Sequence, residues 1–399
     1  MRSPSWFRAV LAGIVTDLAL ENWQEAGFGL YLHWPFCAAK CPYCDFNSHV
    51  SRSIDQEAWQ RAYLSEIDRY AEATPGRVLD SIYFGGGTPS LMDPALVGAI
   101  LDRISDHWTL GNNVEITLEA NPTSIEAAKF AGYRAGGVNR VSVGVQALND
   151  ADLRRLGRIH SVDEAKQALA LAKSTFDRVN FDLIYSRQDQ SLDDWRAELD
   201  QALDMGPDHL SLYQLTIEEG TAFGDRFAAG GLRGLPGDDL AVDQYFLTQE
   251  LCEAAGLPAY EVSNHARPGE ESRHNMIYWQ AGDWIGIGPG AHGRLTLTGR
   301  RIGTETPLSP TEWLKTPGES AREDIPLDEQ AIEYLLMGLR LREGIGLERL
   351  KSRFGMALDP QKLNTLLELG LIELDGPTLR TSREGRPVLN AILRELLSD

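Results

Sequence analysis

The sequence predicts an α/β fold in which a partial, open (β/α)6 barrel is followed by a smaller C-terminal domain. Six short runs rich in β-branched and aromatic residues alternate with segments of helical spacing up to about residue 256. From about residue 325 this alternation gives way to helices and a hairpin. Strand and helix in alternation are typical of a parallel sheet, which right-handed crossovers curl toward a barrel. Six units are two fewer than a closed TIM-like barrel needs, so the barrel should be open.

The expected elements of the barrel follow one another without a long interruption. The strands cover residues 29–34, 81–85, 114–120, 140–145, 178–185 and 209–217. The helices cover residues 56–73, 94–104, 124–136, 163–174, 192–205 and 238–256. In folds of this class the working groups lie on the loops after the carboxyl ends of the strands. A functional site is therefore expected on those loops.

The C-terminal part has a different pattern. Helical spacing covers 329–341, 347–355 and 359–370, a hairpin with a Gly-containing turn covers 371–385, and a last helix follows. Helices followed by a hairpin resemble a small winged-helix module, which reads DNA in other settings. Acidic residues outnumber basic ones here, so packing against the barrel or docking a partner is the better interpretation. The predicted division is an extension (1–26), the barrel with its following segment (27–300), a linker (301–324) and the C-terminal domain (325–399).

Composition and charge exclude several classes of protein. The 399 residues are 43% hydrophobic and 24% charged, which is ordinary for a globular protein with a large core. The net charge of -20 repels phosphate backbones, so we expect no nucleic-acid partner. The longest apolar run, 9–15, is too short to span a membrane, and no signal-peptide exit follows it. These features predict a cytoplasmic protein with reduced thiols.

Three of the four cysteines lie within eight residues, directly after the first expected strand. Cys37, Cys41 and Cys44 form the pattern C-x-x-x-C-x-x-C. A zinc site would need His33 or His49 as its fourth ligand, and a disulfide would leave one thiol over. An iron–sulfur cube on three thiolates would keep one iron free for an external ligand. The fourth cysteine, Cys252, lies in a helical pattern and is expected to be a buried apolar residue.

A glycine-rich stretch follows the second expected strand. The sequence GGGTP at 85–89 would let the backbone approach a ligand closely, although an isolated glycine triplet is more often a tight turn. Its position at a strand end favours the ligand.

Together these motifs resemble the radical S-adenosylmethionine (SAM) superfamily. The cysteine spacing, with Tyr43 before the last cysteine, is similar to its cluster motif, and GGGTP is similar to its glycine-rich motif. The resemblance implies a partial barrel of the radical SAM type and a [4Fe-4S] cluster held by the three cysteines. It also implies that SAM chelates the open iron, and that a reductant such as flavodoxin or ferredoxin supplies an electron for SAM cleavage. Whether cleavage belongs to the physiological role is left open, and no catalytic residue is assigned.

The same resemblance implies a set of contacts to SAM. These fall on Tyr31, Tyr43, Gly86, Gly87, Thr88, Glu119, Gln146, Arg158 and Asp182. Carboxylates suit the ribose hydroxyls and the amino group of SAM, and an arginine suits its carboxylate. Glu119 and Asp182 interrupt apolar strand patterns, where an unpaired charge would be costly.

Further motifs resemble the coproporphyrinogen dehydrogenase-like family over about residues 27–390. They include LEANP (118–122), RVSVGVQ (140–146) and NFDLIY (180–185). The family has a dehydrogenase branch and a heme-chaperone branch, HemW. The dehydrogenase branch carries a further cysteine two places after the last cluster ligand, where this chain has Phe46. The heme-chaperone branch carries H-N-x-x-Y-W, which occurs here as HNMIYW.

The second motif implies a heme site. Its defined positions are His274, Asn275, Tyr278 and Trp279. A neutral imidazole can ligate heme iron and aromatic rings can cover a porphyrin, but a histidine beside aromatics is more often structural. His292 is a second candidate ligand.

We therefore expect a chaperone that binds [4Fe-4S], SAM and heme and delivers heme to an acceptor protein, for example a membrane respiratory component. The first alternative is oxygen-independent conversion of coproporphyrinogen III to protoporphyrinogen IX, and the second is a zinc-stabilised scaffold. The sequence does not decide the oligomeric state. One departure from the family is SRQDQS at 186–191, where Gly-Leu-Pro-Gly is usual, and it should change that wall of the pocket.

Overall fold

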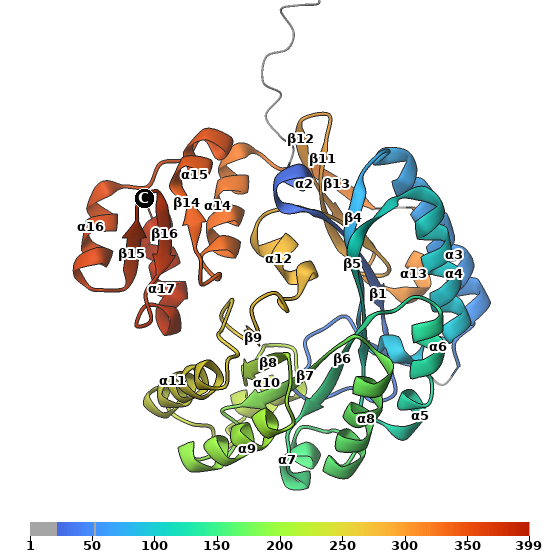
Figure 1. The fold of residues 1–399 in the computed structure, drawn as a ribbon, viewed down its shortest axis with the longest axis horizontal. Helices are drawn as coiled ribbons and strands as arrows, with labels where there is room; N and C mark the ends of the chain where they lie inside the picture. Colours follow the sequence, from blue (N-terminus) through green and yellow to red (C-terminus); the bar gives the residue numbers. More distant parts are fainter. Residues whose placement is uncertain (1–21, 52, 319, 399) are drawn as a thin grey trace, which may run out of the picture.

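A curved eleven-stranded sheet with helices on its convex side forms most of the molecule (Figure 1). The computed structural model describes residues 22–51, 53–318 and 320–398. The strand order is β13-β12-β11-β10-β1-β4-β5-β6-β7-β8-β9, and the sheet does not close on itself. The predicted partial α/β barrel with a smaller C-terminal domain is confirmed.

Six adjacent parallel strands correspond to the six predicted ones. They are β1 (Phe28–Trp34), β4 (Val78–Gly86), β5 (Thr109–Ala120), β6 (Arg140–Gln146), β7 (Arg178–Tyr185) and β8 (His209–Gln214). A seventh parallel strand, β10 (Asp283–Ile287), pairs with β1 on its other side. The alternation of strand and helix did not reveal β10, because it does not follow a crossover helix of the regular series. Antiparallel β9 (Asn264–Ala266) pairs with β8 at the far edge.

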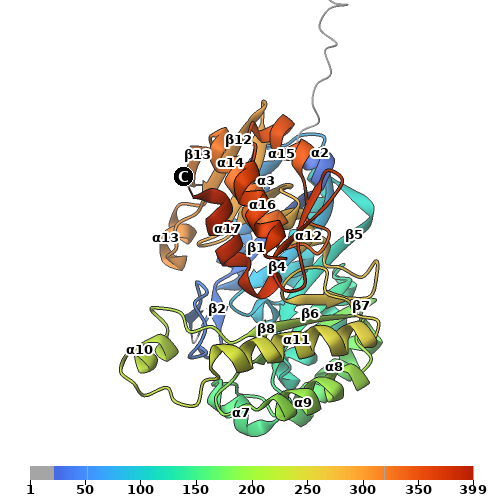
Figure 2. The same ribbon diagram turned by 90° about the vertical axis from the view of Figure 1, so that its left-hand side faces the viewer.

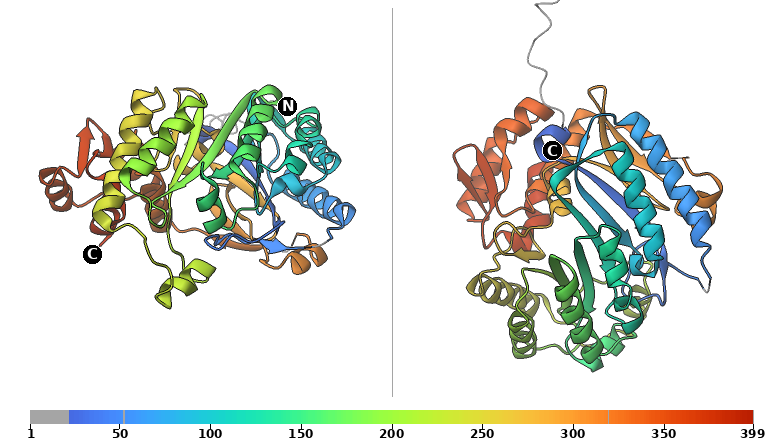
Figure 3. Two further views of the ribbon diagram at one scale, coloured as in Figure 1. Left: turned by 90° about the horizontal axis from the view of Figure 1, so that it is seen from below. Right: turned by 45° about the vertical axis from the view of Figure 1, so that its right-hand side comes forward.

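The helices that connect the parallel strands cover the convex side of the sheet (Figures 1 and 3). They are α3 (Gln56–Ala73), α4 (Pro94–His107), α5 (Ser124–Ala127), α6 (Phe130–Ala135), α7 (Asp150–Arg155), α8 (Val162–Thr175), α9 (Leu192–Asp204) and α11 (Asp238–Ala254). Side chains cap several of their first turns, as Asp55 does for α3 and Ser161 for α8. The single helix predicted over 124–136 is instead the two short helices α5 and α6. None of the helices in the described ranges has the length and apolar character needed to cross a membrane.

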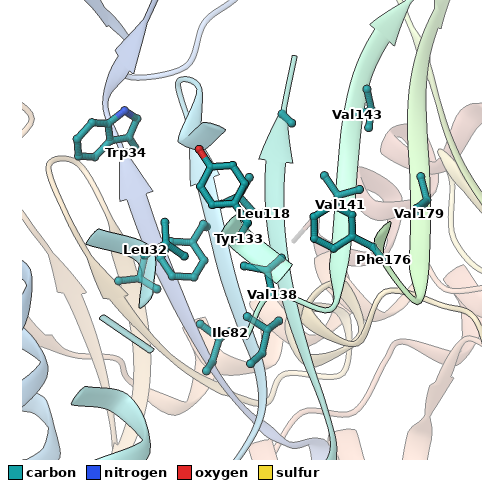
Figure 4. Packing of buried hydrophobic residues seen from close by; sticks show 14 of the residues in the cluster. Leu32, Trp34, Ile82, Leu118, Tyr133, Val138, Val141, Val143, Phe176 and Val179 are labelled. Carbon is teal, nitrogen blue, oxygen red and sulfur yellow. The ribbon is translucent and has the colours of Figure 1, made fainter. Parts of the chain in front are cut away.

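The main core lies between the strands and these helices. Parallel strands with covered faces read as nearly continuous apolar runs, and β1 is buried at six of its seven positions. Leu32, Ile82, Leu118 and Val141 from four neighbouring strands lie side by side in this core (Figure 4). Cys252 on α11 is fully buried in the same cluster, as predicted, and burial raises the pKa of its thiol to about 12.

The prediction that residues 301–324 form a linker is wrong. β12 (Arg300–Glu305) and β13 (Ala321–Asp324) extend the sheet beyond β11 (His292–Leu297), and α13 (Pro310–Lys315) lies between them. The ring of Trp313 on α13 is 0% exposed. Its contacts are made with residues far away in the chain, which is why local patterning did not predict them.

The N-terminal extension predicted over 1–26 lies partly outside the described residues, which begin at 22. Residues Asn22–Ala26 form the helix α2, and its ends contact the C-terminal domain. The Asn22 amide oxygen accepts a hydrogen bond of 2.6 Å from Arg353, and Glu25 pairs with Arg349 at 3.3 Å. These five residues are therefore part of the folded structure.

The C-terminal domain has its own core and a three-stranded sheet (Figures 1 and 2). Its elements are α14 (Leu327–Gly338), β14 (Ile345–Gly346), α15 (Leu347–Phe354), α16 (Pro360–Glu368), β15 (Ile372–Asp375), β16 (Thr378–Thr381) and α17 (Leu389–Leu397). The predicted order of helices, hairpin and last helix is present. Leu335, Leu379 and Ile392 are among the side chains that fill the core between them.

Replacing Trp313 tests whether the 301–324 segment contributes to the stability of the barrel. Trp313 stacks on Trp59 of α3 with ring centroids 5.3 Å apart. Trp313→Ala should lower the free energy of unfolding by about 3–5 kcal/mol, measured by urea denaturation. Leu308→Ala is the control, because that side chain is 61% exposed and its loss should change the free energy by less than about 0.5 kcal/mol. Equal stability of the two variants would show that the segment is only loosely attached.

Candidate functional site

The three clustered cysteines lie on the loop that follows β1, at the carboxyl end of the parallel strands. Within this loop, β2 (Phe36–Cys37) pairs with β3 (His49–Val50). Cys37, Cys41 and Cys44 are free thiols and partly exposed. Burial raises the pKa of the Cys37 and Cys44 thiols. Within the described ranges, no three His, Cys, Asp or Glu side chains already stand close enough together to hold one metal ion.

The two histidines considered as zinc ligands are engaged elsewhere. The buried His33 uses Nδ1 in a hydrogen bond of 2.9 Å with the Tyr31 hydroxyl and Nε2 in one of 2.9 Å with the Asn47 carbonyl. His49 is exposed, and its Nε2 lies 3.1 Å from the Asn47 amide oxygen. Both ring nitrogens of His33 are occupied, so it does not offer the fourth ligand that a closed zinc site needs.

A chain of hydrogen bonds joins two of the cysteine sulfurs through residues that follow β4, β5 and α7. The Thr88 hydroxyl donates to the Cys37 sulfur at 3.4 Å and accepts from the Asn121 amide at 3.2 Å. The Arg158 guanidinium donates to the Asn121 amide oxygen at 2.5 Å and to the Cys41 sulfur at 3.4 Å. Donors that face sulfur stabilise a thiolate, which is the form that binds metal. The Thr88 donor therefore opposes the burial that raises the pKa of the Cys37 thiol.

Arg158 connects several other predicted site residues. Its guanidinium also donates to the Gly144 carbonyl at 2.9 Å, while its buried Nε has no hydrogen-bond partner. Tyr43 interacts electrostatically with both Arg158 and Cys41, and burial raises the pKa of its hydroxyl. Gln146 ends β6 in a left-handed conformation, with φ of 73°, at an irregularity in strand pairing. Its amide nitrogen would lie 2.9 Å from a Cβ placed on Gly144, so Gln146 and Arg158 share one small space over that glycine.

Two carboxylates are drawn into the barrel interior, as their positions in apolar strands suggested. Glu119 accepts hydrogen bonds from the Tyr83 hydroxyl at 2.7 Å and from the Gly86 backbone N–H at 3.1 Å. Burial raises the pKa of Glu119 to about 7, and the negative charge of Asp182 adds to the increase.

Asp182 lies in a polar part of the interior. The Asn180 amide donates to its carboxylate at 3.2 Å and the Ser142 hydroxyl at 3.4 Å. Burial raises its pKa to about 6, while hydrogen bonds and the nearby Arg140 and Arg158 oppose the rise. Two acidic groups with pKa values displaced toward neutrality, in one interior, are typical of a ligand or catalytic site.

The glycine stretch is required by packing against β1 and β2. Gly86 has φ of +113°, and a Cβ there would lie 2.6 Å from the His33 ring. A Cβ on Gly87 would lie 2.7 Å from the Phe36 carbonyl oxygen. The close approach that the sequence predicted is therefore made to the chain itself, and the Gly86 N–H is occupied by Glu119.

The His274 side chain is buried against β4 of the barrel. It begins the first turn of α12 (Arg273–Trp279), which lies on the concave side of the sheet (Figure 1). Its Nδ1 lies 2.9 Å from the Ser81 hydroxyl and its Nε2 lies 2.8 Å from the Tyr278 hydroxyl. The imidazole stacks on Tyr83 with ring centroids 4.8 Å apart. Burial lowers the pKa of His274 to about 3, so the ring is neutral near pH 7.

Tyr83 links this histidine to the predicted SAM contacts. The Tyr83 ring stacks on His274, and the Tyr83 hydroxyl donates a hydrogen bond to Glu119. Tyr31 stacks on both Tyr83 and His274, at 6.3 and 6.1 Å between ring centroids. The two predicted sites therefore adjoin, which the sequence alone did not indicate.

The other residues of the HNMIYW motif face different surroundings. Tyr278 packs edge-on against Trp284 with ring centroids 4.4 Å apart, and the Asn275 amide lies 3.4 Å from the Tyr260 hydroxyl. Trp279 instead faces the C-terminal domain, where the Arg340 guanidinium covers its ring at 4.6 Å. A cavity of about 260 Å³ lies beside it. His274 and Trp279 thus point to opposite sides of α12, toward the barrel and toward the C-terminal domain.

The remaining sequence features also have definite places. His292 is exposed at the start of β11, and Phe46 is 59% exposed on the cysteine loop. In the unusual segment 186–191, Ser186 and Asp189 have positive φ, and the buried Arg187 pairs with Glu198 at 2.5 Å. Arg187 also pairs with Asp152 at 2.9 Å, so two carboxylates hold this segment in place.

Asn121 and Tyr83 are the residues that the sequence analysis missed. Asn121 lies in the quoted motif LEANP, directly after a strand, and its position at a strand end was a sufficient signal. Tyr83 lies inside a strand and carried no signal, because an aromatic residue there is expected to belong to the core.

Two family models match the chain. The radical SAM superfamily matches residues 31–202, and the HemN C-terminal domain matches residues 325–388. The bovine mitochondrial radical S-adenosyl methionine domain-containing protein 1 is 39% identical over 92% of this chain and 87% of its own length. The heme chaperone HemW of Escherichia coli is 36% identical over 93% of this chain and 98% of its own length, and that of Mycobacterium tuberculosis H37Rv is 37% identical over 93% and 95%.

One solved structure is similar over most of the chain. Coproporphyrinogen III oxidase (HemN) from Escherichia coli, described as a radical SAM enzyme, aligns with a TM-score of 0.77 over 93% of this chain and 90% of that one. The two sequences are 22% identical, so this likeness establishes the fold alone.

The raised pKa of Glu119 predicts a specific pH dependence of stability. Its pKa is about 7 when folded against 4.5 for an ordinary glutamate, so rising pH through this interval costs the folded protein stability. Glu119→Gln removes that contribution and keeps an acceptor for Tyr83 or Gly86. The free energy of unfolding of the variant minus that of the wild type should therefore increase between about pH 5 and pH 7, by at most about 1.4 kcal/mol per pH unit.

Urea denaturation at several pH values measures this difference. Glu57→Gln on the exposed side of α3 is the matched control and should show no such trend. A Glu119→Gln difference that stays flat or falls with pH would mean that Glu119 is ionised throughout this range.

Proposed function

Because this chain belongs to the radical SAM family that includes the heme chaperone HemW, we propose that it binds heme and delivers it to acceptor proteins. The observation that carries the proposal is the high identity to bacterial heme chaperones along nearly the whole chain. The HNMIYW motif on α12 supports it independently. A location in the cytoplasm and an acceptor in the respiratory membrane are consistent with the same proposal.

Three cysteines are proposed to hold a [4Fe-4S] cluster that SAM completes. Cys37, Cys41 and Cys44 supply thiolates, and the Thr88 and Arg158 donors that already face sulfur would stabilise their negative charge. When bound, the cluster supplies an electron, received from a reductant protein, that can cleave SAM. The described residues thus fit the cluster in donor type and in surrounding charge.

The polar groups beside the cysteine loop are proposed to bind SAM. Arg158 can pair with a carboxylate, and its Nε has a donor to spare. Glu119 and Asp182 can accept from hydroxyl or ammonium groups, and a positive ligand beside them would lower their raised pKa values. The Gly86 N–H already donates to Glu119, so it is not a free donor for SAM, whereas the Glu119 carboxylate can accept further hydrogen bonds.

His274 is proposed to ligate the heme iron, which requires one of its present hydrogen bonds to break. An imidazole must be neutral to bind a metal, and burial keeps this one neutral at physiological pH. Both ring nitrogens are hydrogen-bonded, to Ser81 and Tyr278. Coordination of iron by His274 therefore requires one of these hydroxyls to move away, and Tyr278 is the partner on the same short helix.

The coproporphyrinogen dehydrogenase activity is the less favoured alternative. The chain shares its fold with the solved oxidase, but Phe46 stands where the dehydrogenase branch has a further cysteine. This phenylalanine is exposed on the cysteine loop and offers no thiol to that chemistry.

Iron content after anaerobic reconstitution tests the cluster. Wild-type protein incubated with iron and sulfide should bind about four iron atoms per chain and absorb near 400 nm. Cys37→Ser, Cys41→Ser and Cys44→Ser should each lose most of that iron, whereas Cys252→Ala, which removes a thiol buried far from solvent, should keep it.

Addition of SAM should change the electron paramagnetic resonance spectrum of the reduced cluster, because three thiolates leave one iron open. A spectrum indifferent to SAM would indicate a fully protein-ligated centre and contradict the proposal.

Heme titration of paired variants tests His274 as a ligand rather than as a structural residue. His274→Ala should weaken binding of heme by roughly tenfold or more, which corresponds to at least about 1.4 kcal/mol. Ser81→Ala removes the partner of Nδ1 but keeps the imidazole, so its heme affinity should stay within about twofold of wild type. Soret absorbance during the titration measures the heme affinity of both variants. Equal losses in the two variants would assign the effect to disturbed packing of α12, and no loss would remove His274 from the site.

Parallel assays separate the two functions. Reconstituted protein should transfer heme to a heme-free acceptor such as apomyoglobin, and should not convert coproporphyrinogen III in the presence of SAM and a reductant. Formation of protoporphyrinogen IX would establish the alternative.

A further inference from the structure

A cleft rich in arginine lies between α11 of the barrel and the hairpin of the C-terminal domain. Its volume is about 320 Å³, at the lower end of the range for small-molecule sites. Figure 2 shows α11 below the C-terminal elements that form the other wall. Four arginines line it: Arg342, Arg380, Arg383 and Arg386. This local concentration of positive charge contrasts with the net charge of -20 of the whole chain.

Three glutamates, Glu250, Glu253 and Glu373, also line the cleft and offset most but not all of this charge. Arg342 pairs with Glu253 at 3.0 Å, and Arg380 pairs with Glu373 at 2.8 Å. Among the described residues, no carboxylate forms a salt bridge with Arg386. Two of the cationic groups are thus paired, and the most deeply placed one is not.

Arg386 is the central group of the cleft. Its side chain is 9% exposed, and its Nη1 has no hydrogen-bond partner. Burial lowers the pKa of the guanidinium, and the charge of Arg342 acts in the same direction. The Tyr245 hydroxyl and the Thr381 hydroxyl, both buried at the same cleft, also lack partners. Three unpartnered polar groups around one cavity are costly unless a ligand satisfies them.

Glu261, a buried acid that acts electrostatically on Arg386, is already engaged by other partners. Its carboxylate accepts from the Asn264 amide at 2.7 Å and from Arg340 at 3.0 Å. Arg340 is the same guanidinium that covers the ring of Trp279. The Arg340–Glu261 ion pair therefore stands between Trp279 of the HNMIYW motif and the surroundings of Arg386. Because Glu261 is engaged by Arg340, the Arg386 guanidinium is available to a ligand.

We propose that this cleft binds an anion that carries carboxylate or phosphate groups. A planar guanidinium matches such a group with two parallel hydrogen bonds, and the two hydroxyls can donate to its remaining oxygens. The anion has two candidate sources: a small free anion, or the propionate groups of heme. The second source rests on the proposed function.

Thermal unfolding of the full chain tests the cleft. Sodium phosphate and sodium succinate should each raise Tm in a concentration-dependent way relative to sodium chloride at equal ionic strength, because a ligand that binds only the folded state stabilises it. Arg386→Gln and Arg383→Gln should lose most of that shift. Arg383 is exposed, so its variant folds even if the buried one does not. Arg300→Gln, which alters an exposed arginine at the other edge of the sheet, should keep the full shift.

The absence of any anion-specific shift, or an equal shift in Arg383→Gln and Arg300→Gln, would overturn the proposal. Titration with heme and with heme dimethyl ester then identifies the source. Weaker binding of the ester by wild type, but not by Arg383→Gln, assigns the cleft to propionates. Equal binding of both forms, with a phosphate or succinate shift present, assigns it to a free anion. If heme does not bind at all, the proposed function fails while the phosphate and succinate results still decide the cleft.

Discussion

The need to balance charge inside the barrel is the constraint on which the candidate site depends. Glu119 and Asp182 point from strands into a largely covered interior, where an isolated carboxylate would be costly. Arg140 and Arg158 enter the same interior and lower the pKa of one or both carboxylates. Most polar groups there are held by another, while the Arg158 Nε and the Asn180 amide oxygen keep hydrogen-bonding capacity for a ligand. Such preorganisation is what a binding site for a charged cofactor requires.

Long-range contacts explain which parts of the fold the sequence could predict. The regular alternation of strand and helix sufficed for the six central strands, because each unit carries its own periodic pattern. β10 was missed because no crossover helix of the series precedes it. The segment 301–324 was taken for a linker because Trp313 packs against Trp59 of α3, more than two hundred residues away. Patterns within a short window contain no information about such partners.

For the candidate site, too, the sequence predicted local features but not long-range contacts. The place of Thr88 after β4 was predictable, since parallel strands bring their carboxyl ends together. Arg158 lies beyond α7, and only the family resemblance implied it. The contacts between these side chains were not predictable, because they depend on the direction in which each side chain points. Examples are the Asn121 amide, which joins Thr88 to Arg158, and the Tyr83 ring, which lies between Glu119 and His274. The motif HNMIYW likewise predicts composition but not orientation. Only the structure separates His274, inside the barrel, from Trp279, toward the C-terminal domain.

The short helix α12 makes these two surroundings dependent on each other. His274 and Tyr278 are four residues apart and share the face toward the barrel, where Tyr83 connects them to Glu119. Trp279 follows directly and lies under Arg340, whose partner Glu261 acts electrostatically on Arg386 of the arginine-lined cleft. Tyr278 and Trp279 are consecutive residues of this helix, so a ligand that shifted the backbone at Tyr278 would also shift Trp279 against Arg340. Coupling of this kind is reciprocal: if heme alters the surroundings of Glu119, then occupancy beside Glu119 must alter the affinity for heme by the same factor.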